Sequence, residues 1–285
     1  MCMSCIISKK HDPFLAFRIA VNIPFNIAAC LFAGVSQREE QSNEVQSLLQ
    51  SFTSNFESMN VSEMKHSVHR LKDCIKTKTT ITPERLREYA WEKRNAQRYS
   101  DANALFCVAA CLSAEKLKGQ VSMRVIILCL KGMKEVSLEM LHNKVIALEV
   151  VKGLVIPLMH EVKEKMEEVV IAKKDLKCKL LVNGLNHIST CEAAVGQLNE
   201  AMATIEYCLS RMDEQFGEES SKQRVYGGLL YDIGNLYKSM FCFSDARQSF
   251  EKAKLAYKAA LDIDNVNRKY WLDKCEKRCK ECDNH

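Results

Sequence analysis

The chain has 285 residues, of which 47% are hydrophobic, 10 are glycine and 4 are proline. So few helix-breaking residues favour an all-α protein. The net charge of +5 is small for this length and gives no indication of a nucleic-acid-binding protein. The length exceeds what one compact core usually contains, and it suits two domains or one helical array.

The 14 cysteines do not follow the pattern of a secreted disulfide framework, which occupies short loops in a small chain. Most of them lie inside apolar helical runs: Cys30, Cys107, Cys111, Cys129, Cys178, Cys191, Cys208 and Cys242. A free cysteine in such a run behaves as a small buried hydrophobic residue. The pattern therefore predicts reduced thiols and a cytoplasmic protein.

Residues 1–80 are predicted to form an N-terminal helical region or cap. Their first apolar run, 13–35, is interrupted by Arg18 and two asparagines. It is too broken for a membrane span or a secretory signal, so no membrane partner is expected. Two amphipathic helices are predicted to follow, at 44–56 and 61–75.

Further along, a triplet of residues recurs with spacings of +4 and +3. The triplets are Ala102-Phe106-Ala109, Ala246-Phe250-Ala253 and, more loosely, Ala201-Ile205-Cys208. A small residue, Ala90, Gly234 or Ser189, stands 12 positions before the first member of each triplet. This arrangement predicts pairs of helices in which an aromatic or aliphatic residue of the second helix packs on the first. Gly234 is expected to let a second backbone come close.

The pattern closely resembles the tetratricopeptide repeat, a helix–turn–helix unit whose copies stack on one another. The resemblance is strongest at 226–263, and it extends to 83–114 and 184–217. The interval of 45 residues between Ala201 and Ala246 resembles the longer repeats of kinesin light chains. The resemblance implies an all-α fold, a right-handed α-solenoid of tetratricopeptide-like helix pairs.

This array is predicted to cover 81–264, with a C-terminal capping helix at 265–285. A fourth pair is left open near 128–151, where Gly132 keeps the spacing but the alanine and aromatic positions are absent. One connecting helix is expected over 155–179, bent or ended at Pro157.

The resemblance also implies a concave groove, lined by the first helix of each pair, that binds a peptide segment of a partner protein. The residues it places there are Arg87, Trp91, Arg94, Asn186, Thr190, Tyr231, Asn235 and Lys238. Family members that clamp a peptide use an asparagine at the place of Asn235. A clamp for a C-terminal carboxylate also needs a cluster of Lys and Arg, whereas Asn186 and Thr190 occupy the middle pair. Arg87 and Arg94, with Trp91 between them, instead suit an acidic or aromatic segment.

No sequence motif indicates an enzyme: there is no glycine-rich phosphate loop, no H-E-x-x-H and no G-x-S-x-G turn. Cys275, Cys279, Cys282 and His285 have spacings that metal ligands use, but one helix rarely surrounds a zinc ion. We therefore expect no cofactor and no metal. Two alternatives to a peptide-binding scaffold remain open. One is an RNA-binding tetratricopeptide protein, and the other is a structural subunit whose groove is filled by its own N-terminal helices or by a second copy.

Overall fold

The structure is a computed structural model that describes residues 59–76, 81–143 and 147–283. The chain divides into two compact units, 1–51 and 52–285, and all the described residues belong to the second. Within the described ranges every regular element is a helix, which confirms the predicted all-α class. The helices expected at 13–33 and 44–56 lie outside these ranges.

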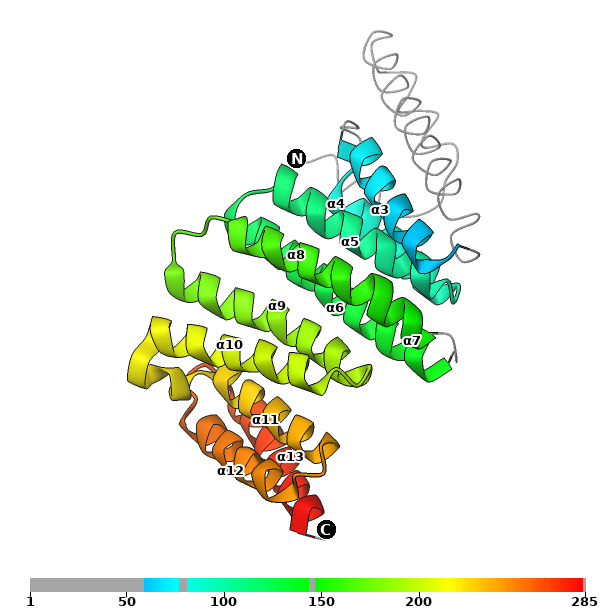
Figure 1. The fold of residues 1–285 in the computed structure, drawn as a ribbon. Coiled ribbons are helices and arrows are strands. Elements are labelled where there is room, and N and C mark those ends of the chain that lie inside the picture. The colour runs from blue at the N-terminus through cyan, green and yellow to red at the C-terminus, as the bar shows by residue number, and fades with distance from the viewer. Residues whose placement is uncertain (1–58, 77–80, 144–146, 284–285) are drawn as a thin grey trace, which may run out of the picture. The chain divides into compact units, whose positions relative to one another are not determined.

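The helices follow one another with short connections (Figure 1). They are α3 (Val61–Lys76), α4 (Pro83–Asn95), α5 (Tyr99–Lys116), α6 (Gly119–Asn143), α7 (Ala147–Val150), the π-helix η3 (Val151–Val155), α8 (Ile156–Glu168), α9 (Lys174–Ala194), α10 (Leu198–Phe216), the 3₁₀-helix η4 (Gly217–Lys222), α11 (Arg224–Ser239), α12 (Phe243–Ala259) and α13 (Asn265–Asp283).

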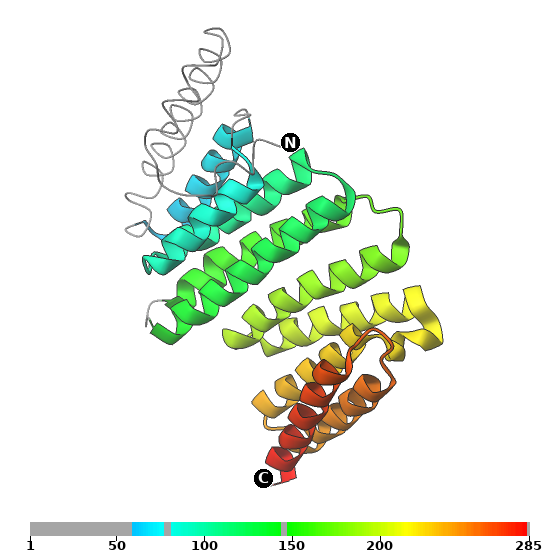
Figure 2. The same ribbon diagram turned by 180° about the vertical axis from the view of Figure 1, so that it is seen from behind.

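Consecutive helices pack as antiparallel pairs, and each pair packs on the next (Figures 1 and 2). Helix α4 pairs with α5, α9 with α10, and α11 with α12. Helix α6 packs against α5, against α9 and against the segment α7–η3–α8 that follows it. We call α4, α6, α9 and α11 the first helices, because each precedes the helix or segment that packs back against it. The result is a repeat-like helical architecture.

The three pairs predicted from the triplets share one turn geometry. The middle turn residue has a positive φ in each: 60° at Gln97, 82° at Gly196 and 61° at Phe241. In each turn the next N–H donates to the carbonyl five residues earlier over 2.9 Å: Arg98 to Lys93, Gln197 to Glu192, and Cys242 to Tyr237. This is the Schellman motif, which satisfies carbonyls left free at a helix end. The shared spacing in the sequence therefore reflects a shared turn.

At two contacts between neighbouring helices, a glycine makes room for an aromatic ring. Gly234 on α11 faces Phe250 on α12, and a Cβ added at Gly234 would lie 2.5 Å from Cε1 of that ring. The neighbour of Gly234 is thus a side chain, where a second backbone was expected. Gly132 on α6 stands in the same relation to Phe106 on α5, at 2.6 Å from Cζ. The first helices approach their neighbours closely because these positions carry no side chain.

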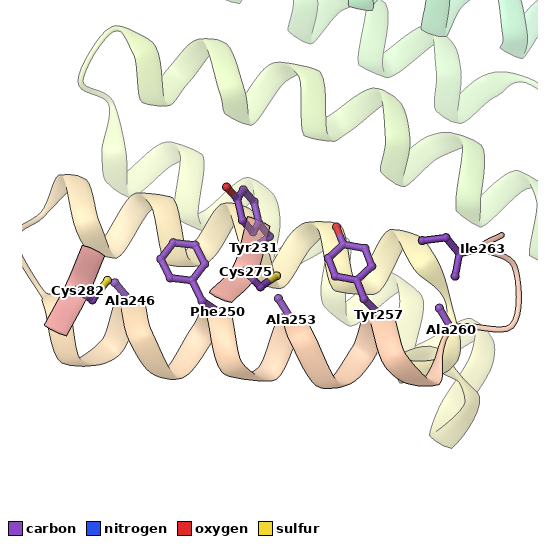
Figure 3. Close-up of a cluster of buried hydrophobic side chains, with 9 residues drawn as sticks. All are labelled: Tyr231, Ala246, Phe250, Ala253, Tyr257, Ala260, Ile263, Cys275 and Cys282. Atoms are coloured by element: carbon purple, nitrogen blue, oxygen red, sulfur yellow. The ribbon is translucent and has the colours of Figure 1, made fainter. Parts of the chain in front are cut away.

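Helix α13 closes the last pair. Figure 3 shows the cluster of buried side chains that α11, α12 and α13 build together, with Phe250 and Tyr257 at its centre. Trp271 of α13 stacks on Tyr257 with ring centroids 5.2 Å apart. Burial of this apolar surface holds α13 against α12.

The segment between α6 and α9 differs from the expected single helix over 155–179. A π-helix, Val151–Val155, precedes Pro157, and the N–H of Ile156 donates to the carbonyl of Val151. This change of hydrogen-bond register lets the helix continue through a residue that has no N–H to donate. The helix ends at Glu168, and α9 starts at Lys174.

The described helices include none that is long and apolar enough to span a membrane. Six of the cysteines expected inside helices are buried: Cys107, Cys111, Cys129, Cys178, Cys191 and Cys208. Cys242 is exposed, because it lies in the turn before α12 and outside the helix. Cys30 is outside the described residues.

Candidate functional site

A small pocket lies where α9, α10 and α11 meet, and we call it the α9–α11 pocket. Its volume is about 140 Å³. It is lined by Ser189, Thr190, Ala193, Ile205, Asp232, Asn235, Leu236 and Ser239. Two of these residues, Thr190 and Asn235, were predicted as peptide contacts from the sequence.

Asp232 supplies the negative charge of the pocket. Its Oδ2 accepts a hydrogen bond of 2.9 Å from the side-chain amide of Asn186, and the amide of Asn235 also stabilises the charged carboxylate. Burial raises the pKa of Asp232, while the two amides and the more distant Lys274 and Lys134 act in the opposite direction. No lysine or arginine in the described part of the chain lies within 4.0 Å of this carboxylate.

Each of the three hydroxyl groups of the pocket donates its proton to a backbone carbonyl. Ser189 Oγ lies 3.1 Å from the carbonyl oxygen of Asn186, and Thr190 Oγ1 lies 2.8 Å from the same atom. Ser239 Oγ lies 3.0 Å from the carbonyl oxygen of Asn235. A hydroxyl has one proton, so each oxygen that donates to a helix carbonyl keeps only lone pairs for the pocket. The polar lining therefore mainly accepts hydrogen bonds.

A larger cavity, of about 340 Å³, lies between the start of α9 and the end of α10. Of its four charged lining residues, Lys177, Arg211 and Glu214 are paired with one another or with the backbone. Arg211 contacts Glu214 at 2.8 Å, and Lys177 Nζ donates to the carbonyl oxygen of Glu167 at 2.9 Å. Gln215 donates to Asp175, also at 2.8 Å. The α9–α11 pocket is the stronger candidate because its carboxylate lacks a cationic partner.

The remaining predicted residues of the last pair are used to hold α13. Tyr231 is only 4% exposed, and its hydroxyl oxygen accepts a hydrogen bond of 3.1 Å from Arg278 Nε. Lys238 forms an ion pair with Glu281 of α13. Neither side chain lines the open groove that was expected, because α13 covers this part of α11.

The predicted residues on α4 are separate from the pocket, since α4 packs on α5 and α6. Arg94 forms a two-pronged contact with the carboxylate of Glu139 on α6, through Nε at 2.9 Å and through Nη2. Trp91 packs edge-on against Phe106, with centroids 5.1 Å apart. Arg87 is half-buried and has no hydrogen bond or ion pair within the described ranges.

The structure thus brings Asn186, Thr190 and Asn235 together around Asp232, a residue that the sequence analysis missed. A signal was available, since Asp232 follows Asn186 by 46 residues, which is close to one repeat. A comparison of polar residues one repeat apart would have found the pair.

No group of three or more His, Cys, Asp or Glu side chains suited to a metal ion occurs among the residues that the structure describes. Cys275 and Cys282 are buried in the cluster that α13 forms with α12, and Cys279 packs against it. His285 lies outside the described ranges.

Comparison with models of known protein families gives no match for the chain, and comparison with curated proteins gives none either. The resemblance to tetratricopeptide proteins therefore depends on the residue pattern alone.

Proposed function

We propose that the chain is an interaction scaffold, built as a right-handed α-solenoid of tetratricopeptide-like helix pairs. It binds a segment of a partner protein along its first helices, needs no cofactor and catalyses no reaction. The observation that carries this proposal is the α9–α11 pocket. Two neighbouring first helices present there a half-buried carboxylate, three hydroxyl oxygens and an apolar wall.

The shared turn of the three pairs supports the architectural part of the proposal, because a stacked array buries the apolar face that each pair leaves open. The free, mostly buried cysteines support a reducing compartment, and we propose the cytoplasm. RNA binding is disfavoured at this site, since Asp232 would repel a phosphate.

Site-specific photo-crosslinking tests the proposal. A benzoylphenylalanine at Thr190, on the pocket wall, is compared with one at Glu206, an exposed residue of α10. We expect a crosslinked partner only from position 190, and we expect its yield to fall when Asn235→Ala is added. Equal yields from both positions, with circular dichroism confirming the folded state, would reject the groove as the binding surface. A crosslinked product with the mass of two chains would support the self-association alternative.

A further inference from the structure

We infer that the α9–α11 pocket takes the cationic end of a lysine or arginine side chain from the partner segment. This inference rests on the proposed function and specifies the ligand of its central site. It follows from the charge, the hydrogen-bonding groups and the shape of the pocket.

The charge of the pocket is incompletely balanced. Two other carboxylates that are buried more deeply have a basic neighbour: Glu192 contacts His160 at 3.0 Å, and Asp101 contacts Arg98 at 2.5 Å. Asp232 receives only neutral amides. A buried carboxylate is best stabilised by a cation with good hydrogen-bond geometry, and an external ammonium or guanidinium group would provide it.

Neither of the two lysines that act on the pKa of Asp232 forms an ion pair with it within 4.0 Å. Lys274 of α13 and Lys134 of α6 influence Asp232 only over a distance. The Nζ of Lys274 lies 4.8 Å from the centre of the Trp271 ring and 5.3 Å from that of Tyr231, so it is held by aromatic faces on α11 and α13. The space beside Asp232 thus remains for a cation from outside.

The hydrogen-bond acceptors of the pocket favour a ligand that donates hydrogen bonds. The hydroxyl oxygens of Ser189, Thr190 and Ser239 face the pocket with lone pairs, because their protons go to backbone carbonyls. An ammonium group has three N–H donors and a guanidinium has five, and neither has an acceptor. A carboxylate or phosphate would instead meet oxygen atoms and the negative charge of Asp232.

The apolar wall matches the rest of such a side chain. Ala193, Ile205 and Leu236 line the pocket beside its polar groups. Lysine and arginine carry three or four methylene groups that pack on apolar surface while the charged end reaches a polar partner. The volume of about 140 Å³ suits the end of one side chain more closely than a folded segment.

Selection from a phage-displayed library of random dodecapeptides on the immobilised full chain tests the inference. The strongest peptide is then synthesised with its basic residue intact or replaced by norleucine, which keeps the stem without the charge. Binding is measured by fluorescence anisotropy with the natural chain, with Asp232→Asn and with Asp273→Asn. Asp273 is an exposed residue of α13 outside the pocket, so its substitution makes the same charge change elsewhere.

We expect the selected peptides to share one lysine or arginine. Replacing the basic residue of the peptide by norleucine should weaken its binding to the natural chain and to the Asp273→Asn chain by about tenfold. The same replacement should weaken its binding to the Asp232→Asn chain by less than about twofold. Thr190→Val removes one hydrogen-bond acceptor and keeps the size of the side chain, so it should weaken binding of the basic peptide by about threefold. This variant tests the inference if Asp232→Asn does not fold. Peptides that bind without a shared basic residue, or a norleucine effect equal in all chains, would overturn the inference and leave the scaffold intact. Selection of no peptide at all by the folded chain would reject the proposed function, and the inference with it.

Discussion

The side-chain amide of Asn186 on α9 donates to the carboxylate of Asp232 on α11 over 2.9 Å and joins two first helices across 46 residues. Similar polar links join α4 to α6 and α11 to α13: Arg94 to Glu139 across 45 residues, and Lys238 to Glu281 across 43. The three separations are close to the interval of 45 residues between Ala201 and Ala246. The links from α4 to α6 and from α9 to α11 therefore each span one step of the repeat, and Lys238 makes a link of similar length to α13. The polar face of the first helices serves partly to hold neighbours in place.

Replacing Asn186 by alanine should lower the free energy of unfolding by about 1–2 kcal/mol, because a half-buried carboxylate loses the amide that donates to it over 2.9 Å. Urea unfolding followed by circular dichroism at pH 7 measures this change. Asn199→Ala, at an exposed position in the first turn of α10, is the matched control and should change stability by less than about 0.5 kcal/mol. Equal effects of the two substitutions would mean that the link between α9 and α11 adds nothing to stability.

Glu281 should make stability depend on pH. Hydrogen bonds from Lys238 and Arg278 lower its pKa to about 2, against an ordinary value of 4.5. A carboxyl group whose pKa is lower in the folded state contributes stability above pH 4.5, and this contribution is lost as the pH falls from 4.5 to 2. Because the pair is partly exposed, we expect Glu281→Gln to cost only about 1 kcal/mol at pH 7.

Urea unfolding midpoints of the natural chain and Glu281→Gln, measured between pH 7 and pH 2, check this prediction. The difference between them should be constant down to pH 5, shrink below pH 4.5 and nearly vanish at pH 2. A high salt concentration should reduce it at pH 7. A difference that does not change with pH would show that packing, not charge, is lost in the variant.

At the equivalent positive-φ position of two of the shared turns, adding a glycine should raise stability and removing one should lower it. Gln97 is exposed and has a φ of 60°, a conformation that glycine adopts at little cost, so Gln97→Gly should stabilise the protein by about 1 kcal/mol. Gly196 has a φ of 82° with nothing near a Cβ added there, so Gly196→Ala should destabilise by a similar amount through backbone strain alone. Thermal unfolding of both variants measures the changes. Ala96→Gly, at a negative φ in the first of these turns, is the control and should not stabilise.

The helix pairs around these turns are the part of the fold that was best predicted from the sequence. The Schellman geometry fixes the distance from the end of one helix to the first small residue of the next, so the offset of 12 residues persists although the turn residues differ. The segment between α6 and α9 could not be predicted in the same way, because a π-helix shifts the register before Pro157.

The site was predicted only in part, for a different reason. Sequence spacing assigns a residue to a face of its own helix, but it does not say which later helix will cover that face. Tyr231 and Lys238 lie on the expected helix, yet α13 covers one and pairs with the other. Asp232 was missed because a single acidic residue between apolar neighbours has no pattern until Asn186 is placed beside it.

The contact between Gly234 and Phe250 gives the sharpest test of how the pairs pack. A methyl group at Gly234 would lie 2.5 Å from the ring, which is fully buried and packs against Tyr231 at 5.3 Å between centroids. The ring has little room to move, so Gly234→Ala should cost about 2–3 kcal/mol. Gly228→Ala, on the same helix, should instead be neutral or stabilise by up to about 1 kcal/mol, because its Cβ would lie 3.6 Å from the Tyr257 hydroxyl and alanine favours the helix.

Urea unfolding of both variants, and of Gly234→Ala combined with Phe250→Leu, measures the contact. The smaller leucine should recover part of the loss caused by Gly234→Ala, giving a coupling energy of about 1 kcal/mol or more between the two positions. Additive effects of the two substitutions would contradict the close approach of α11 and α12 at this point. That approach sets the spacing within the pair, and the position of Asp232 in the pocket depends on it.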